Sequence, residues 1–204
     1  MMTNWEKSFE YFNRINVGYF DVPEDILLYL NTKSNATKPA NHRLVGHIKE
    51  EYDYNNVPKE VQRFFISKCF QQPIKHHLDH ISILNDPLPL NLDSLWINYQ
   101  KKYEFNPVHD HGGVFSFIIF LKIPYDLNKE DSMFPVADQN RQTSRLQFLT
   151  INPILGVTTV SLNVDKSYEN KMIMFPSSYK HLVYPFYTSN EERITVSGNL
   201  RFLV

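Results

Sequence analysis

Apolar residues alternate with polar ones in a series of short runs from residue 90 to the end of the chain. Turn residues and polar connections separate these runs, a pattern that is typical of β-strands. Seven short strands linked in this way predict a mainly β fold, either a β-sandwich or a rolled-up jelly-roll barrel. The expected strands are residues 94–100, 114–123, 144–150, 157–163, 171–175, 181–185 and 193–203.

The first ninety residues carry a mixed pattern of helical and polar segments. Residues 16–22 favour a strand that leads into a helix starting at Pro23, because proline suits the first helical position. Pro58 opens a second helical stretch with one apolar face, and a further helical piece is expected at residues 74–83. Residues 31–41 are polar and predict a loop. We expect the helices to cover one face of the β-sheet.

Length and composition suit one globular domain. The chain has 204 residues, of which 42% are hydrophobic, enough for a substantial core. We expect residues 1–204 to form a single domain, with residues 1–90 as a helical or mixed support and residues 91–204 as the β core. The abundance of Asn and Lys and the small number of glycines, 6 in all, favour an AT-rich genome such as that of a phage or a bacterium.

Charge and cysteine content narrow the setting. The 21 basic and 22 acidic side chains nearly balance, so nothing favours nucleic acid or an anionic membrane as a partner. Cys69 is the only cysteine, which excludes an intrachain disulfide and favours a reducing, cytoplasmic location. The N-terminus lacks the apolar stretch of a secretory signal. We expect Cys69 to be a small buried hydrophobe.

Three histidines and an arginine stand out as candidate chemistry. His109 and His111 are two positions apart at the opening of an apolar run, and a strand turns alternate side chains to one face. Both rings can therefore point at one metal ion. A return strand carrying His181 could complete three ligands on one side of that ion and leave open positions on the other. Arg193 lies twelve residues beyond His181.

The residues around the third histidine carry a longer motif. Phe-Pro-Ser-x-x-x-His-x-Val-x-Pro spans residues 175–185, and Arg-Ile-Thr follows at residues 193–195. With the H-x-H pair upstream, this order resembles the iron(II)- and 2-oxoglutarate-dependent oxygenases. It is most similar to a small bacterial and phage group with H-x-H before an apolar strand and F-P-S…H…V…P…R at the end. The resemblance covers residues 95–200 and says little about residues 1–90.

The resemblance implies a double-stranded β-helix with Fe(II) at the mouth of the barrel and 2-oxoglutarate as cosubstrate. His109 and His181 match the two histidine ligands of the family. Arg193 matches the basic residue that binds the distal carboxylate of 2-oxoglutarate, because a guanidinium can hold a carboxylate with two hydrogen bonds. Thr195 would add a hydroxyl to the same carboxylate. The implied activity is that of a dioxygenase that hydroxylates a substrate and releases succinate and CO2.

His111 departs from the commonest family pattern, in which H-x-D or H-x-E supplies a carboxylate ligand. Three neutral imidazoles leave a ferrous site more positive than the usual triad does. Asp110 is adjacent to His109, and a regular strand would aim it at the opposite face, although a bulge could redirect it. We therefore expect His109, His111 and His181 to be the metal ligands, with Asp110 in place of His111 as the open alternative.

Further candidates are weaker. Asn98 lies on the expected opening strand and Tyr103 just past its end, and either could contact the carboxylates of 2-oxoglutarate. A helical histidine cluster at residues 76–80 has a spacing that can bind zinc, but surface or packing roles are favoured. Gly112–Gly113 would let the backbone turn tightly beside the metal. The polar connection 124–143 has the length of a functional lid.

Two other functions stay open. Cupin-like metal dioxygenases that use no 2-oxoglutarate share the H-x-H…H set, although they usually place a glutamate after the pair and lack the terminal Arg-x-Thr. The non-catalytic alternative is a jelly-roll structural or binding module with a vestigial metal site. The substrate, whether a small molecule or a peptide, cannot be read from the sequence. We expect no nucleic acid or membrane partner, and a homodimer is compatible with small barrels of this kind.

Overall fold

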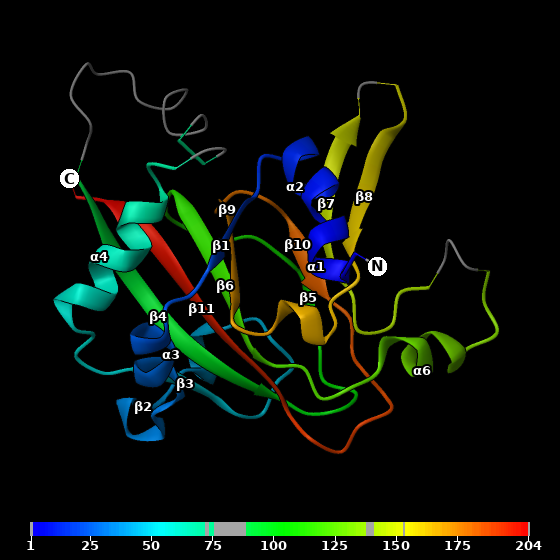
Figure 1. The fold of residues 1–204 in the computed structure, drawn as a ribbon, viewed down its shortest axis with the longest axis horizontal. Helices are drawn as coiled ribbons and strands as arrows, with labels where there is room; N and C mark the ends of the chain where they lie inside the picture. The colour runs from blue at the N-terminus through cyan, green and yellow to red at the C-terminus, as the bar shows by residue number, and fades with distance from the viewer. Residues whose placement is uncertain (1, 72–73, 76–88, 138–140, 153, 204) are drawn as a thin grey trace.

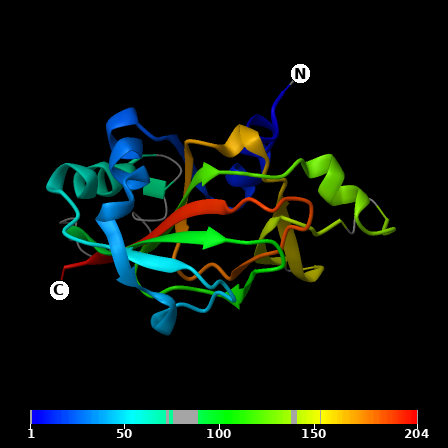
Figure 2. The same ribbon diagram turned by 90° about the horizontal axis from the view of Figure 1, so that it is seen from below.

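Two antiparallel sheets that face each other form the body of the computed structural model, which describes residues 2–71, 74–75, 89–137, 141–152 and 154–203 (Figures 1 and 2). The larger sheet contains, in spatial order, β1 (Gly18–Asp21), β9 (Lys171–Pro176), β6 (Phe115–Lys122), β11 (Arg193–Phe202), β4 (Leu90–Gln100), β3 (Glu51–Tyr54) and β2 (Ala36–Pro39). The smaller sheet contains β5 (Asn106–His109), β10 (His181–Val183), β7 (Leu146–Asn152) and β8 (Gly156–Leu162).

The path of the chain from β4 to β11 gives the fold its class. Over this stretch the chain places four strands in each sheet and passes between the sheets as it goes. Every strand pair is antiparallel, and β11 lies between β4 and β6 over most of its length. This is the double-stranded β-helix, or jelly roll, that the sequence predicts.

Short helices surround the sheets. They are α1 (Asn4–Lys7), α2 (Phe9–Arg14), α3 (Glu24–Asn31), α4 (Lys59–Lys68) and α6 (Leu127–Ser132), with 3-10 turns at Lys33–Asn35, Asn41–Arg43 and Lys166–Tyr168. Helices α3 and α4 begin one residue later than the sequence predicts, because Pro23 and Pro58 are their N-caps and not their first helical residues. No helix among the described residues is long and apolar enough to cross a membrane.

All seven strands expected from the sequence are present, with ends that differ by a few residues. The placement of the H-x-H pair at the start of a strand is wrong. His109 is the last residue of β5, and the turn that holds His111 precedes β6. Residues 31–41, expected to be a loop, contain the edge strand β2. This strand is short and mostly polar, as edge strands often are, so it has no apolar alternation. The helix expected at residues 74–83 lies outside the described residues, apart from a helical Ile74 and Lys75.

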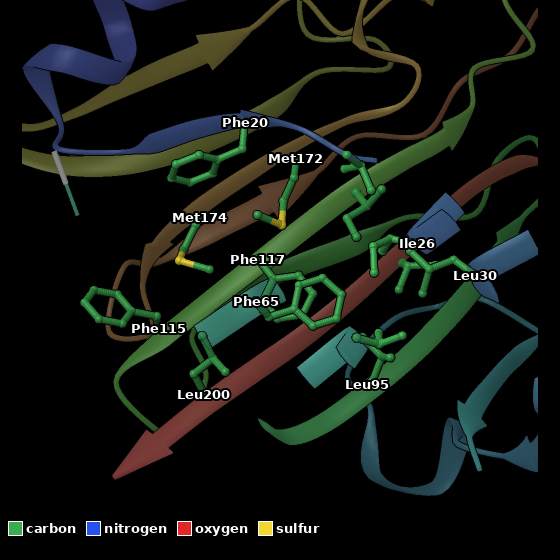
Figure 3. Packing of buried hydrophobic residues seen from close by; sticks show 14 of the residues in the cluster. Phe20, Ile26, Leu30, Phe65, Leu95, Phe115, Phe117, Met172, Met174 and Leu200 are labelled. Carbon is green, nitrogen blue, oxygen red and sulfur yellow. The ribbon is translucent and has the colours of Figure 1, made fainter. Parts of the chain in front are cut away.

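The outer face of the larger sheet carries one of two hydrophobic clusters. Along β4 and β11, alternate residues such as Ile97 and Val196 point to this face, and α3 and α4 cover it. Figure 3 shows Phe65 of α4 packed on Phe117 of β6, and their rings stack with centroids 4.3 Å apart. Cys69 is fully buried in the same cluster, as the sequence predicts. The expected helical cover of one sheet face is therefore present.

The second cluster lies between the sheets and beneath α1 and α2. Trp5 and Phe12 from these helices pack with Phe148 of β7, Phe175 of β9 and Tyr168. This apolar filling occupies only part of the space between the sheets. The remaining part is lined by polar side chains of β4 and β11, and it contains the candidate site.

Candidate functional site

Three histidine side chains converge at one end of the smaller sheet. His109 ends β5 and His181 begins β10, and the two residues are directly opposite each other in the antiparallel pair. The ring centroids of His109 and His181 are 4.2 Å apart, and His111 lies 4.9 Å from the first and 5.2 Å from the second. One ligand nitrogen from each ring lies within 4.8 Å of the others. This grouping suits a single metal ion with open positions on the remaining side.

Hydrogen bonds fix which nitrogen two of the rings present. Nδ1 of His109 lies 2.8 Å from the carbonyl oxygen of Pro107, and Nδ1 of His181 lies 2.9 Å from that of Tyr179. A carbonyl only accepts, so Nδ1 carries the proton and donates in each case. The unprotonated Nε2 is then the metal-binding nitrogen, oriented by its backbone partner as metal-binding histidines usually are.

The histidines are held in the neutral form that a metal requires. Burial, followed by repulsion from the neighbouring His109, lowers the pKa of His181 to about 3 and the pKa of His111 to about 4. Burial also lowers the pKa of His109. Neutral imidazoles offer a free lone pair to a cation without first losing a proton.

Backbone contacts join the two histidine motifs. The amide of His111 donates to the carbonyl of Ser177 (2.9 Å), and the amide of Ser177 donates to the carbonyl of Val114 (3.0 Å). Gly113 adopts φ +102°, and a Cβ there would lie 2.7 Å from the carbonyl oxygen of Leu200. Only glycine tolerates this combination, so the tight turn expected beside the metal is present at Gly113.

Asp110 lies outside the histidine cluster. Its carboxylate accepts a hydrogen bond from Lys180 Nζ at 2.8 Å, and its side chain is 48% exposed. Lys180 lowers the pKa of this carboxyl. The structure therefore groups His111, and not Asp110, with the other two histidines.

A cavity of about 260 Å³ extends from the histidines across the inner face of the larger sheet. Trp96 and Asn98 of β4, Ser197 of β11 and Glu51 of β3 are among its lining residues. A smaller cavity of about 30 Å³ shares Asn98 and Ser197 with the first and reaches Arg193. The two cavities thus adjoin each other, one beside the histidines and the other beside Arg193.

Arg193 is a buried cation that has no acidic partner among the described residues. It opens β11, is 3% exposed, and makes no ion pair within the part of the chain that the structure describes. Nε and Nη2 of the guanidinium both donate to Oε1 of Gln100. Nη1 donates to the Tyr125 hydroxyl (3.3 Å) and to the Ser144 carbonyl (3.1 Å). Nη2 also donates to the Tyr184 carbonyl (3.4 Å). All of these acceptors are neutral, so a carboxylate replacing one of them would supply the missing countercharge.

The other expected cosubstrate contacts divide into two groups. Thr195 follows Arg193 on the same face of β11, and its hydroxyl accepts from Nδ2 of Asn98 at 3.2 Å. Oδ1 of Asn98 is buried without a hydrogen-bond partner beside the cavity. Tyr103 lies elsewhere: it is 61% exposed, has a positive φ, packs against Tyr187 and lines neither cavity. The structure thus brings Asn98 and Thr195, but not Tyr103, together with Arg193.

Several lining residues were missed by sequence reasoning. Trp96 and Gln100 share the inward face of β4 with Asn98, and the polar alternation along that strand was the available signal. Arg43 lies with its guanidinium carbon 5.2 Å from the centroid of the Trp96 ring, on the wall of the larger cavity. Glu51 gave no signal, because its strand is only four residues long.

A family model described as "Putative 2OG-Fe(II) oxygenase" matches residues 94–199, just over half of the chain. The chain belongs to this 2OG-Fe(II) oxygenase family. The matched residues contain the three histidines, Asn98, Arg193 and Thr195. No curated protein sequence matches this oxygenase.

Solved structures support the fold of the oxygenase. A Pseudomonas putida prolyl-4-hydroxylase superposes with a TM-score of 0.54 at 12% identity, over 97% of this chain and 98% of the other. An oxidoreductase of the 2OG-Fe(II) oxygenase family from Burkholderia pseudomallei gives a TM-score of 0.51 at 10% identity, over 98% of this chain and 90% of the other. These identities are low, so the likeness concerns the double-stranded β-helix itself.

The oxygenase uses Fe(II) and 2-oxoglutarate, the cofactor and cosubstrate of its family. The residues present fit both. Three neutral imidazoles with Nε2 free in at least two of them form a suitable donor set for Fe(II). A buried guanidinium that makes no ion pair among the described residues fits one end of a dicarboxylate, and Asn98, whose Oδ1 has no hydrogen-bond partner there, lies next to it.

Proposed function

We propose that this oxygenase is a hydroxylase that oxidises 2-oxoglutarate to succinate and CO2 while it hydroxylates its substrate. The observation that carries the proposal is the buried guanidinium of Arg193. It has no acidic partner among the described residues and lies beside cavities that extend from the three histidines. A three-histidine metal site alone would suit several oxidations. The arginine adds a place for a second carboxylate, which only a dicarboxylic cosubstrate needs.

The residues have distinct proposed roles. His109, His111 and His181 hold Fe(II), which supplies the activation of dioxygen when it is bound. Arg193 binds the distal carboxylate of 2-oxoglutarate, and Thr195 lies beside it to donate its hydroxyl to the same group. The Thr195 hydroxyl already accepts from the Asn98 amide, which leaves its own hydrogen available for the carboxylate.

The remaining neighbours of Arg193 act on its orientation. Gln100, Tyr125 and the Ser144 carbonyl hold the guanidinium plane in place before the cosubstrate arrives. The rings of Tyr125 and Phe186 lie 6.0 and 5.9 Å from its central carbon and keep water away from it. A preorganised, desolvated cation binds a carboxylate more strongly than a solvated one does.

An anaerobic titration tests this function. Apo-protein is titrated with iron(II) and then with 2-oxoglutarate, and the visible charge-transfer band of a metal-chelated 2-oxo acid is recorded. We expect the band in the wild type, its loss at the same 2-oxoglutarate concentration in Arg193→Ala, and its retention in Arg201→Ala. Arg201 is the matched control because it lies on the same strand but is exposed and paired with Asp93.

The alternatives give different results in this titration. Iron binding without a band would favour a three-histidine dioxygenase that does not use 2-oxoglutarate. No iron binding would favour a non-catalytic jelly-roll module. Formation of succinate that depends on an added substrate would complete the assignment as a hydroxylase.

A further inference from the structure

A buried carboxylate forms part of the wall of the larger cavity. Glu51 of β3 is directly opposite Asn98 of β4, and Asn98 is directly opposite Thr195 of β11. Opposed residues in neighbouring strands point to the same face of a sheet, so these three side chains form one polar row on the inner face. Glu51 is 2% exposed and lines the same cavity as the three histidines.

The carboxylate of Glu51 makes no ion pair in the described part of the chain. Its side chain accepts one hydrogen bond, from Nδ2 of Asn41 at 3.2 Å, and no Lys or Arg forms an ion pair with it there. Arg43, the cation on the same cavity wall, is instead paired with Asp53. A buried carboxylate normally requires an opposite charge and further donors. Burial, and then repulsion from Glu104, raises the pKa of Glu51 to about 7, although the charge of Arg43 acts in the opposite direction.

A second acceptor lies close to the Glu51 carboxylate. Oε1 of Glu51 would be 3.1 Å from a Cβ placed on Gly46, and Oδ1 of Asn106 would be closer still. Both oxygens therefore approach the same point beside Gly46, which has no side chain. Oδ1 of Asn106 is buried and has no hydrogen-bond partner. Two converging acceptors are best satisfied by a group that carries several N–H donors and no acceptor, as ammonium and guanidinium groups do.

We propose that the substrate of the oxygenase carries a positively charged nitrogen, an amine or a guanidine, that binds Glu51 and Asn106 in the larger cavity. This inference rests on the proposed hydroxylase function and adds the chemical class of its substrate. Glu51 determines specificity: it binds the cationic end of the substrate, and a carbon farther along the molecule lies near the histidines. The other acid on the cavity wall, Asp110, is exposed and already paired with Lys180, so it does not compete for the cation.

The test uses the anaerobic holoenzyme with iron(II) and 2-oxoglutarate bound. The probes are N-acetyl-lysine amide and N-acetyl-arginine amide, each matched to an uncharged analogue of similar size, N-acetyl-norleucine amide and N-acetyl-citrulline amide. Capping removes the α-amine and α-carboxylate, so each pair differs in the side-chain charge. Binding is read as a perturbation of the charge-transfer band, and succinate formation in air is the second readout.

We expect at least one cationic probe to bind at least about tenfold more tightly than its neutral partner. Glu51→Gln should remove that preference and leave the band formed by 2-oxoglutarate itself unchanged. Glu50→Gln is the matched control, because Glu50 is the neighbouring carboxylate, is 40% exposed and paired with Lys101, lines neither cavity, and should leave the preference intact.

Two results would overturn the substrate class. One is a wild-type holoenzyme that shows the band but binds no cationic probe better than its neutral partner. The other is a preference that persists in Glu51→Gln. Absence of the band in the wild type would instead contradict the proposed hydroxylase function, so the two failures can be told apart.

Discussion

The outer and inner faces of the larger sheet are built by the same strands, and they differ in how completely their side chains are satisfied. On the outer face, Ile97 of β4 and Val196 of β11 pack beneath α3 and α4 in a continuous apolar cluster. On the inner face, Asn98 has an unpartnered oxygen, and Arg193 and Glu51 make no ion pair among the described residues. The outer face contributes to stability, whereas the inner face leaves polar groups available for ligands.

This difference has an energetic consequence. A buried charge without a partner costs several kcal/mol, because protein neighbours replace water incompletely. The inner face therefore lowers the stability of the ligand-free protein, and ligands that supply the missing charges raise it again. Substitutions on the outer face should therefore lower the stability of the protein, whereas substitutions on the inner face should weaken ligand binding.

The largest expected effect is on the outer face. Phe65→Ala removes a fully buried ring that stacks on Phe117, and we expect the free energy of unfolding to fall by about 3–5 kcal/mol. Urea denaturation of the iron-free protein measures the change. Phe64→Ala, at the neighbouring half-buried position, is the control and should cost clearly less. Equal losses for the two variants would contradict the assignment of Phe65 to the core of this face.

The metal ligands come next in magnitude. His111→Ala should weaken iron(II) binding by at least about 100-fold, because one of three ligands is lost. His111→Asp should retain binding, since it creates the two-histidine, one-carboxylate set of the commoner oxygenases. Asp110→Asn should leave the affinity unchanged, because that carboxylate pairs with Lys180 at the surface. Anaerobic iron titration measures all three, and loss of binding in Asp110→Asn would show that Asp110 is the ligand.

The charge on Glu51 should appear as a pH dependence of stability. Its pKa rises from 4.5 to about 7 on folding, so the folded protein holds a proton that the unfolded chain releases between these pH values. Stability contributed by the protonated form is therefore lost as pH rises through this window. The free energy of unfolding of Glu51→Gln, taken relative to that of the wild type, should therefore increase by on the order of 2 kcal/mol as the pH rises from 4.5 to 8.

Comparison of the two proteins isolates this effect. The buried histidines lower stability as pH falls below their usual range, but they are present in both proteins and cancel in the difference. Chemical denaturation of iron-free wild type and Glu51→Gln at several pH values provides the measurement. A difference that stays constant with pH would mean that Glu51 is not held in a desolvated state.

The smallest effect is expected at the exposed end of β11. Arg201→Ala removes a surface ion pair with Asp93, and such pairs contribute about 0–1 kcal/mol. The variant should unfold at nearly the wild-type denaturant concentration. A loss of more than about 1 kcal/mol would show that Arg201 contributes to the fold in a way that its exposed ion pair does not explain.

Alternation and motif order made much of this architecture predictable. The seven strand-like runs each became a strand, and H-x-H, the distal histidine and Arg193 came together around two adjoining cavities. The expected placement of H-x-H at the start of a strand was wrong because β5 begins with Asn106 and Pro107 and shows no apolar alternation. The histidines were therefore placed at the start of the apolar run that follows, which forms β6.

Other parts of the site depend on contacts that no local pattern encodes. Glu51 reaches the cavity only because β3 pairs with β4 in a register that places it opposite Asn98. Tyr103 was expected near the cosubstrate because it lies close to Asn98 along the chain, but a turn with a positive φ directs it to the surface. The binding of Arg193 by Gln100, Tyr125 and Ser144 likewise joins segments that are distant in sequence.

The most direct test of the account compares two 2-oxo acids that differ at their distal end. Iron(II)-loaded protein is titrated anaerobically with 2-oxoglutarate and with 2-oxopentanoate, which chelates a metal equally well but has no distal carboxylate. We predict that 2-oxoglutarate binds on the order of 100-fold more tightly, and that Arg193→Ala removes the difference. Equal affinity for the two acids in the wild type would contradict the assignment of Arg193 and the inner face as the cosubstrate site.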